Sequence, residues 1–196
     1  MIEFIEESHT YLIDGVITPS VSEILNFIFP DKYSNIPKQI LNTKANYGSK
    51  VHEAIERLEK NEELPKLNYL QEISIDQYRK LKDKYKIEVL EQEKMVHYEN
   101  YYCGRFDMIA EINGFYSLCD IKTTAKLDKE SLSWQLSYYA LAHNLDEYET
   151  EFKKFYAIWL PKKDLGEIVE IERKSKQELL EKLKEFRKYY ENNSEN

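Results

Sequence analysis

The sequence predicts an α/β fold in which a central mixed β-sheet is flanked by α-helices. Residues 102–110 and 115–122 have the composition of strands, and Asn113 and Gly114 between them indicate a tight hairpin because both residues tolerate positive φ. Along the chain, the predicted order is helices, three strands, a helix, a strand pair and a helix. This order is typical of a sheet packed against helices.

The amino-terminal segment is expected to begin with strands. Residues 1–13 predict two short strands, and Asp14 with Gly15 predicts a turn after them. A helix then starts at Ser20, which can cap it in a capping box with Glu23, and Pro30 ends it.

More helices are expected before the hairpin. Residues 31–46 predict a loop and then a helix, and Gly48 with Ser49 is expected to interrupt it. A helix with an apolar face should then run to Lys60, followed by a polar loop and a helix over about 70–84.

The remaining predicted elements surround and follow the hairpin. They are a strand within 87–98, a loop at 123–129, a helix at 131–145 capped by Ser131, strands at 152–160 and 165–171, and an amphipathic helix at 176–190 before a frayed end. One domain is expected over residues 1–196, with a helical part at about 20–85, a core at about 86–175 and the carboxyl-terminal helix at about 176–190.

The composition limits the class of protein. The net charge of -8 disfavours tight, sequence-independent coating of nucleic acid, although bound cations can neutralise the carboxylates of a site. No apolar run is long enough to cross a bilayer, so we expect no membrane association and a cytoplasmic location. Cys103 and Cys119 lie too far apart in the predicted register for a disulfide, which favours reduced packing residues.

The hairpin register places acidic residues together. Counting outward from the turn pairs Ile112 with Phe115 and puts Asp107 opposite Asp120 on one face of the ribbon. Opposed carboxylates repel unless they share a proton or a divalent cation. Lys122 follows on the same face, and an amine beside a metal is typical of phosphodiester hydrolysis. The alternative is a solvated, charged face without a function.

These residues also carry a resemblance. Gly104-x-x-Asp107 followed by Asp120-x-Lys122 resembles the core signature of the PD-(D/E)XK nuclease superfamily. Three other segments and one acidic residue resemble its RecB-like branch, which includes phage exonucleases and the mitochondrial genome maintenance exonuclease. They are residues 9–25, the glycine-to-histidine segment 48–52, the Gln-x-x-x-Tyr segment that starts at Gln135, and Glu93.

The resemblance implies a restriction-endonuclease-like α/β core and a site that uses Mg²⁺ or Mn²⁺. Asp107, Asp120, His52 and the carbonyl of Ile121 would hold the metal. Lys122 would orient or deprotonate the attacking water. Considered alone, His52 is better explained as an ordinary helix histidine beside an apolar face than as a metal ligand.

Three further residues are expected near this site. Gln135 and Tyr139 share a helix face, where they would support the site or contact the DNA backbone; the alternative is a role in packing only. Glu93 is the preferred acidic residue of the strand before the hairpin, but Glu88 and Glu91 compete with it.

The resemblance favours a DNA exonuclease that acts on single-stranded ends in recombination, repair or replication, together with a partner protein of such a process. The alternatives are an endonuclease or nickase with the same site, and a non-catalytic descendant that binds DNA or protein. Exposed aromatic residues would stack on bases. The candidates are Tyr33, Tyr47, Tyr101, Tyr102 and Trp134.

Overall fold

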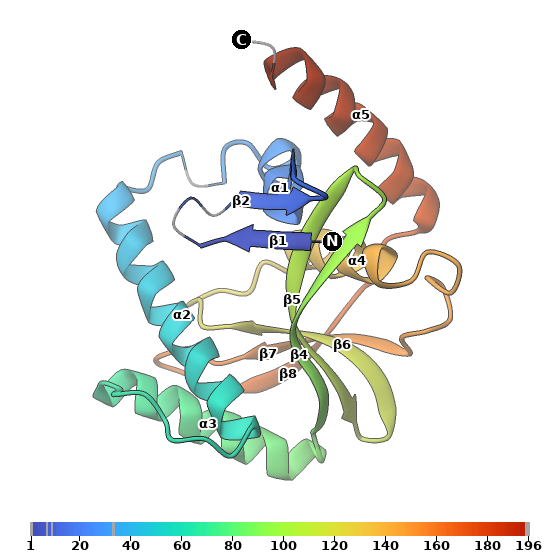
Figure 1. Ribbon diagram of the computed structural model, residues 1–196. Coiled ribbons are helices and arrows are strands. Elements are labelled where there is room, and N and C mark those ends of the chain that lie inside the picture. The colour runs from blue at the N-terminus through green and yellow to red at the C-terminus, as the bar shows by residue number, and fades with distance from the viewer. Residues whose placement is uncertain (1, 7, 9, 33, 195–196) are drawn as a thin grey trace.

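A five-stranded mixed sheet forms the centre of the molecule (Figure 1). The computed structural model describes residues 2–6, 8, 10–32 and 34–194; His9 and Tyr33 therefore lie outside the described residues. The strands follow in the order β4 (Glu88–Tyr98), β5 (Tyr102–Ile112), β6 (Phe115–Lys122), β7 (Lys154–Trp159) and β8 (Glu167–Ile171). Only β6 and β7 run parallel, so the predicted mixed sheet is confirmed.

A small antiparallel sheet precedes the first helix. It consists of β1 (Ile2–Ile5), β2 (Thr10–Ile13) and β3 (Val16–Thr18). The first two strands and the turn at Asp14 and Gly15, which both have positive φ, agree with the prediction. The third strand was not predicted, because three residues are too short to show a periodic pattern.

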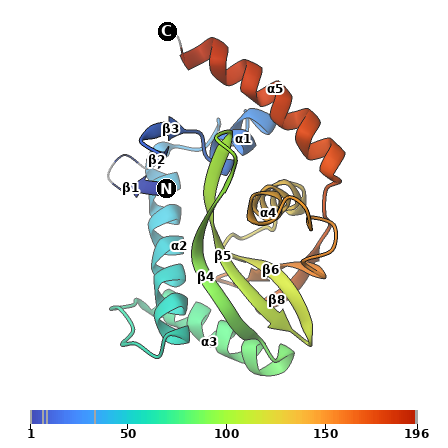
Figure 2. The same cartoon turned by 45° about the vertical axis from the view of Figure 1, so that its right-hand side comes forward.

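Helices cover both faces of the central sheet (Figure 2). They are α1 (Val21–Ile28), α2 (Lys38–Glu59), α3 (Tyr69–Tyr85), α4 (Lys129–His143) and α5 (Lys176–Ser194). Side chains of α2 and α3 form one core with one face of the sheet, while α1, α4 and α5 form the other core. The crossover from β6 to β7 passes through α4, as a parallel strand pair requires.

The ends of the helices show which capping predictions hold. The capping box of α1 is confirmed: Glu23 N–H donates to Ser20 Oγ at 3.2 Å, and Ser20 N–H donates to the Glu23 carboxylate at 2.8 Å. Helix α4 begins at Lys129 rather than at 131, and its cap is Asp128, which accepts a hydrogen bond from Ser131 N–H at 3.1 Å. Aspartate and serine are about equally good helix caps, but Ser131 lies inside the first turn, so its own N–H is one of the groups that the cap must satisfy.

The predicted interruption at Gly48 and Ser49 is wrong, because both residues lie inside the continuous helix α2. Tyr47, Val51 and Ile55 are buried against the core on one side of this helix. A glycine inside a helix costs only about 1 kcal/mol, and burial of these side chains exceeds that cost. Helix α5 likewise continues to Ser194, beyond the expected end at 190.

The hairpin turn is confirmed, but the two strands separate earlier than predicted. Asn113 and Gly114 have φ of 50° and 81°, and Ile112 pairs with Phe115. The β5–β6 ladder ends where Met108 lies opposite Cys119, one pair before Asp107 and Asp120. Both cysteines are free and buried. Among the described residues, no helix has the length and apolar character needed to cross a bilayer.

Candidate metal centre

Three side chains from three elements meet beside the end of the β5–β6 ladder. His52 comes from α2, Glu93 from β4 and Asp107 from β5. One potential ligand atom from each lies within 4.8 Å of the others, and all three side chains are partly exposed. The predicted residues His52, Glu93 and Asp107 are therefore brought together, although they are far apart in the sequence.

The ring of His52 is fixed on both sides. Its Nε2 lies 2.9 Å from the carbonyl oxygen of Ile121, and its Nδ1 lies 3.6 Å from Asp107 Oδ1. A carbonyl only accepts hydrogen bonds, so Nε2 carries a proton and Nδ1 is left to face the carboxylate. Burial lowers the pKa of His52, but the neighbouring Asp107 raises it to about 9. Without a cation the ring is therefore an imidazolium, while a cation could replace the proton on Nδ1.

The backbone of Ile121 holds both partners. Its N–H donates to Asp107 Oδ2 at 2.7 Å, and its carbonyl accepts from His52. Burial raises the pKa of Asp107, but His52, Lys122 and this N–H together hold the pKa below its ordinary value. In the structure the Ile121 carbonyl accepts the hydrogen bond of His52, and its expected role as a metal ligand stays a prediction.

Among the competing glutamates, the structure brings Glu93 to the centre. A bulge between Val89 and Glu91 shifts the register of β4, and Glu93 itself has a left-handed φ of 49°. Glu91 instead forms an ion pair with Lys94 at 2.6 Å. Burial, with the added charge of Asp107, raises the pKa of Glu93 to about 7.

Arg105 is a site residue that the sequence reasoning missed. Its Nε lies 2.9 Å from Glu93 Oε2, and the side chain lines the same cleft. The available signal was its position two residues before Asp107, which places both on one side of a regular strand.

Asp120 and Lys122 form an ion pair next to the three-residue centre. Lys122 Nζ lies 2.7 Å from Asp120 Oδ2, and Asp120 is 1% exposed. Burial raises the pKa of Asp120 to about 6, with Lys122 opposing the rise and Asp107 adding to it. The expected direct opposition of Asp107 and Asp120 across the ladder does not occur, because the ladder ends before them. Asp120 lies outside the compact group of three and holds the lysine.

Tyr139 and Gln135 lie on the other side of the cleft, on α4. Burial raises the pKa of Tyr139, and a hydrogen bond with Gln135 opposes the rise. The Tyr139 ring packs directly against Gly104: a Cβ at that glycine would lie 2.7 Å from Tyr139 Cε1. Gln135 lines a neighbouring cavity together with Lys122. Tyr139 therefore lines the cleft and Gln135 lines the cavity beside it, while their roles at the site stay predictions.

An open cleft of about 730 Å³ contains the centre. His52, Glu93, Asp107 and Lys122 line it, with Tyr139 on its wall. Reactive side chains thus face a space large enough for part of a polymer rather than a closed cavity.

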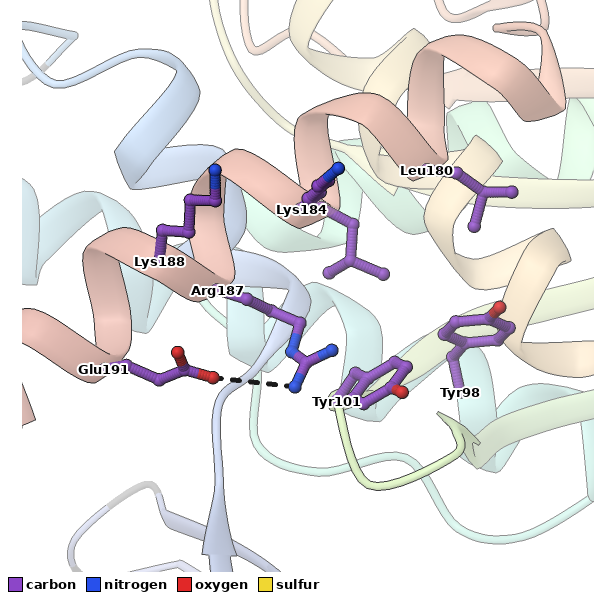
Figure 3. Close-up of a pocket in the computed structure, with 8 residues that line it drawn as sticks. Tyr98, Tyr101, Leu180, Lys184, Arg187, Lys188 and Glu191 are labelled. Atoms are coloured by element: carbon purple, nitrogen blue, oxygen red, sulfur yellow. Dashed lines mark ion pairs between the residues drawn. The ribbon is translucent and has the colours of Figure 1, made fainter.

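Tyr33 lies outside the described residues, and the other four predicted base-stacking residues do not line this cleft. Tyr47, Tyr102 and Trp134 are buried, and each uses its polar atom inside the protein. Tyr101 lines a separate pocket with Tyr98 and residues of α5, where the guanidinium of Arg187 lies 3.8 Å from its ring centroid (Figure 3). Tertiary packing thus excludes base stacking at three of the candidates.

Comparisons with known proteins add little to this geometry. No protein-family model matches the sequence, and no curated protein matches it. Among solved structures, the crystal structure of SSO0001 is similar over 86% of this chain and 73% of its own, with 16% sequence identity and a TM-score of 0.48. Likeness at this level assigns neither a family nor a function.

Proposed function

We propose that this protein is a metal-dependent deoxyribonuclease that hydrolyses phosphodiester bonds, acting as an exonuclease on single-stranded ends. One observation carries the proposal: a histidine and two carboxylates converge in an open cleft, and a buried aspartate holds a lysine beside them. This set of groups suits hydrolysis of a phosphodiester better than group transfer to a cofactor.

The side chains fit a divalent cation. Carboxylate oxygens suit Mg²⁺ and Mn²⁺, and an imidazole ligand favours Mn²⁺. Burial raises the pKa values of Glu93 and Asp120, and the charge of Asp107 adds to both rises; a bound cation would stabilise the ionised carboxylates. His52 Nδ1, Glu93 and Asp107 would hold it. When bound, such an ion lowers the pKa of a water molecule and neutralises charge on the scissile phosphate.

Lys122 would stabilise charge that develops during phosphodiester hydrolysis. Asp120 fixes Lys122 Nζ, so the ammonium group is oriented before substrate binds. It would donate a hydrogen bond to the attacking water or to a phosphate oxygen that gains charge in the transition state. Arg105, held by Glu93, adds a positive charge for a phosphate in the same cleft.

The test compares wild type with Lys122→Ala on end-labelled single-stranded DNA, with Mg²⁺ and Mn²⁺ assayed separately. We expect wild type to release nucleotides and the variant to lose at least about 10²-fold in rate, as for loss of one stabilising donor. Mn²⁺ binding, measured by calorimetry, should persist because Lys122 is not a ligand. Equal nucleotide release by both proteins would contradict the proposal.

An endonuclease or nickase is the second candidate. The cleft shares Thr124 with a cavity on each side, so the strand path does not require an end. Cutting of a circular single strand would select this candidate over a strict exonuclease. DNA binding with no cutting of either substrate would instead favour a non-catalytic descendant.

The cellular role that we propose rests only on the resemblance of the sequence motifs to those of RecB-like nucleases. They favour work in DNA recombination, repair or replication in the cytoplasm, with a partner protein of that process.

A further inference from the structure

A second cavity adjoins the metal cleft on the side of α2 and the segment after β7. Its volume is about 270 Å³, near the lower end of the range for small-molecule sites of about 300–1,000 Å³. Thr123 and Thr124, which follow Lys122 in the chain, line both spaces. A strand with its scissile phosphate at the centre can therefore continue directly into this cavity.

Lysines surround this second cavity. Lys44 of α2 and Lys162 and Lys163 after β7 line it, and all three are exposed. Among the described residues, no ion pair involves any of them; Lys162 lies over the Tyr47 ring at 3.5 Å from its centroid. Three cations beside the single acid Asp164 make this a positive region in a chain of net charge -8.

The positive region extends further from the centre. A third cavity, of about 570 Å³, shares Lys162, Lys163 and Asp164 with the second. It adds Lys80 and also Asp76, which pairs with Arg79 at 3.2 Å. On the other side of the cleft, the cavity next to Gln135 also contains lysines, but Lys32 there is paired with Asp128 at 2.8 Å. Among the described residues, more lysines without an ion pair therefore lie on the α2 side of the cleft than on the side of Gln135.

The wall of the second cavity includes apolar groups as well. Ala125 and Pro161 line it between the lysines, whereas the Tyr47 ring is buried and lies under Lys162. Apolar surface suits the face of a base, and ammonium groups suit the phosphates on either side of it.

We propose that this cavity is a subsite for the nucleotide next to the scissile phosphate of single-stranded DNA, and that Lys44, Lys162 and Lys163 bind the phosphates of the departing strand. The inference rests on the proposed function and adds the direction in which the strand leaves the centre.

The test compares two matched double variants. Lys162→Gln with Lys163→Gln removes two charges from the subsite, and Lys184→Gln with Lys188→Gln removes two from exposed positions on α5, beside the separate pocket (Figure 3). Binding of a fluorescent oligothymidylate to the metal-free proteins is measured by anisotropy at several salt concentrations. We expect about tenfold weaker binding only for the subsite variant. Its salt dependence should also be shallower, by about 0.7 in slope for each phosphate that the variant no longer neutralises.

A second measurement uses bis(p-nitrophenyl) phosphate with Mn²⁺, because this small diester has no neighbouring phosphate for the subsite lysines to bind. The subsite variant should hydrolyse it at the wild-type rate while its KM for the oligonucleotide rises. If wild type cleaves the oligonucleotide and the two double variants bind it equally, the subsite is wrong and the nuclease stands. If wild type neither binds nor cleaves it, the proposed function fails and the subsite with it.

Discussion

At the scale of single residues, His52 shows how the geometry of the proposed metal centre is held by the protein itself. One ring nitrogen is tied to the backbone of Ile121, so the other must face Asp107. Ile121 also donates its backbone N–H to Asp107. Ligand orientation therefore depends on backbone groups, whose positions are set by the sheet rather than by flexible side chains.

Glu93 and Glu91 offer a matched pair for testing the ligand set. Glu93→Gln should weaken Mn²⁺ binding by about tenfold or more, because an amide cannot supply the negative charge that a carboxylate ligand does. Glu91→Gln should leave the affinity unchanged, since Glu91 pairs with Lys94 away from the centre. Calorimetric titration of both variants with Mn²⁺ decides between them. Equal affinities would remove Glu93 from the centre.

At the scale of elements, two glycines differ in the space available for a side chain. Gly104 of β5 lets α4 approach the sheet, because a Cβ there would lie 2.7 Å from the Tyr139 ring and 3.2 Å from Val21 Cγ2. Gly48 of α2 has room: its added Cβ would meet only Thr123 Oγ1, at 3.5 Å. The same change should therefore act in opposite directions at the two positions.

Gly104→Ala should destabilise the protein by about 1–3 kcal/mol, the usual cost of overpacking. Gly48→Ala should stabilise it by about 0.5–1 kcal/mol, because alanine is the better helix former. Urea unfolding followed by circular dichroism measures both changes. A destabilised Gly48→Ala would mean that α2 does not pass through that position as a regular helix.

Sequence predicts most elements but not how they meet. The hairpin follows from Asn113 and Gly114, whose local preference decides the turn. The sequence preferred Glu93 to Glu91 only through the resemblance, because no residue marks the bulge in β4 that shifts the register between Val89 and Glu91. The buried tyrosines show the same limit: an aromatic residue fits a core or a binding surface, and only tertiary packing decides which.

At the scale of the whole molecule, three lysines of an acidic chain line the cavity beside the proposed metal centre. The cations of the second cavity lie beside a centre whose own acids repel one another. Such a centre is destabilised unless protons or cations occupy it, so folding, pH and metal binding are linked.

This linkage predicts how stability changes with pH when metal is absent. The folded pKa of Glu93 is raised to about 7 and that of His52 to about 9, both above their ordinary values. The folded state therefore holds protons that the unfolded chain releases earlier, and its stability falls as pH rises through these values. In EDTA, the melting temperature should decrease from pH 6 to pH 8.5. Above this range the buried cysteines, whose pKa values burial also raises, would add to the fall.

Saturating Mn²⁺ should remove most of this decrease, because the cation takes the place of the protons at His52 and Glu93. Differential scanning fluorimetry at pH 6, 7.5 and 8.5, with EDTA or with Mn²⁺, measures both curves. Glu93→Gln serves as the control: the neutral amide cannot ionise, so its curve in EDTA should be flatter than that of wild type between pH 6 and 7.5. A wild-type melting temperature that rises with pH in EDTA would show that the three side chains do not share a proton-binding centre, and the metal site would lose its physical basis.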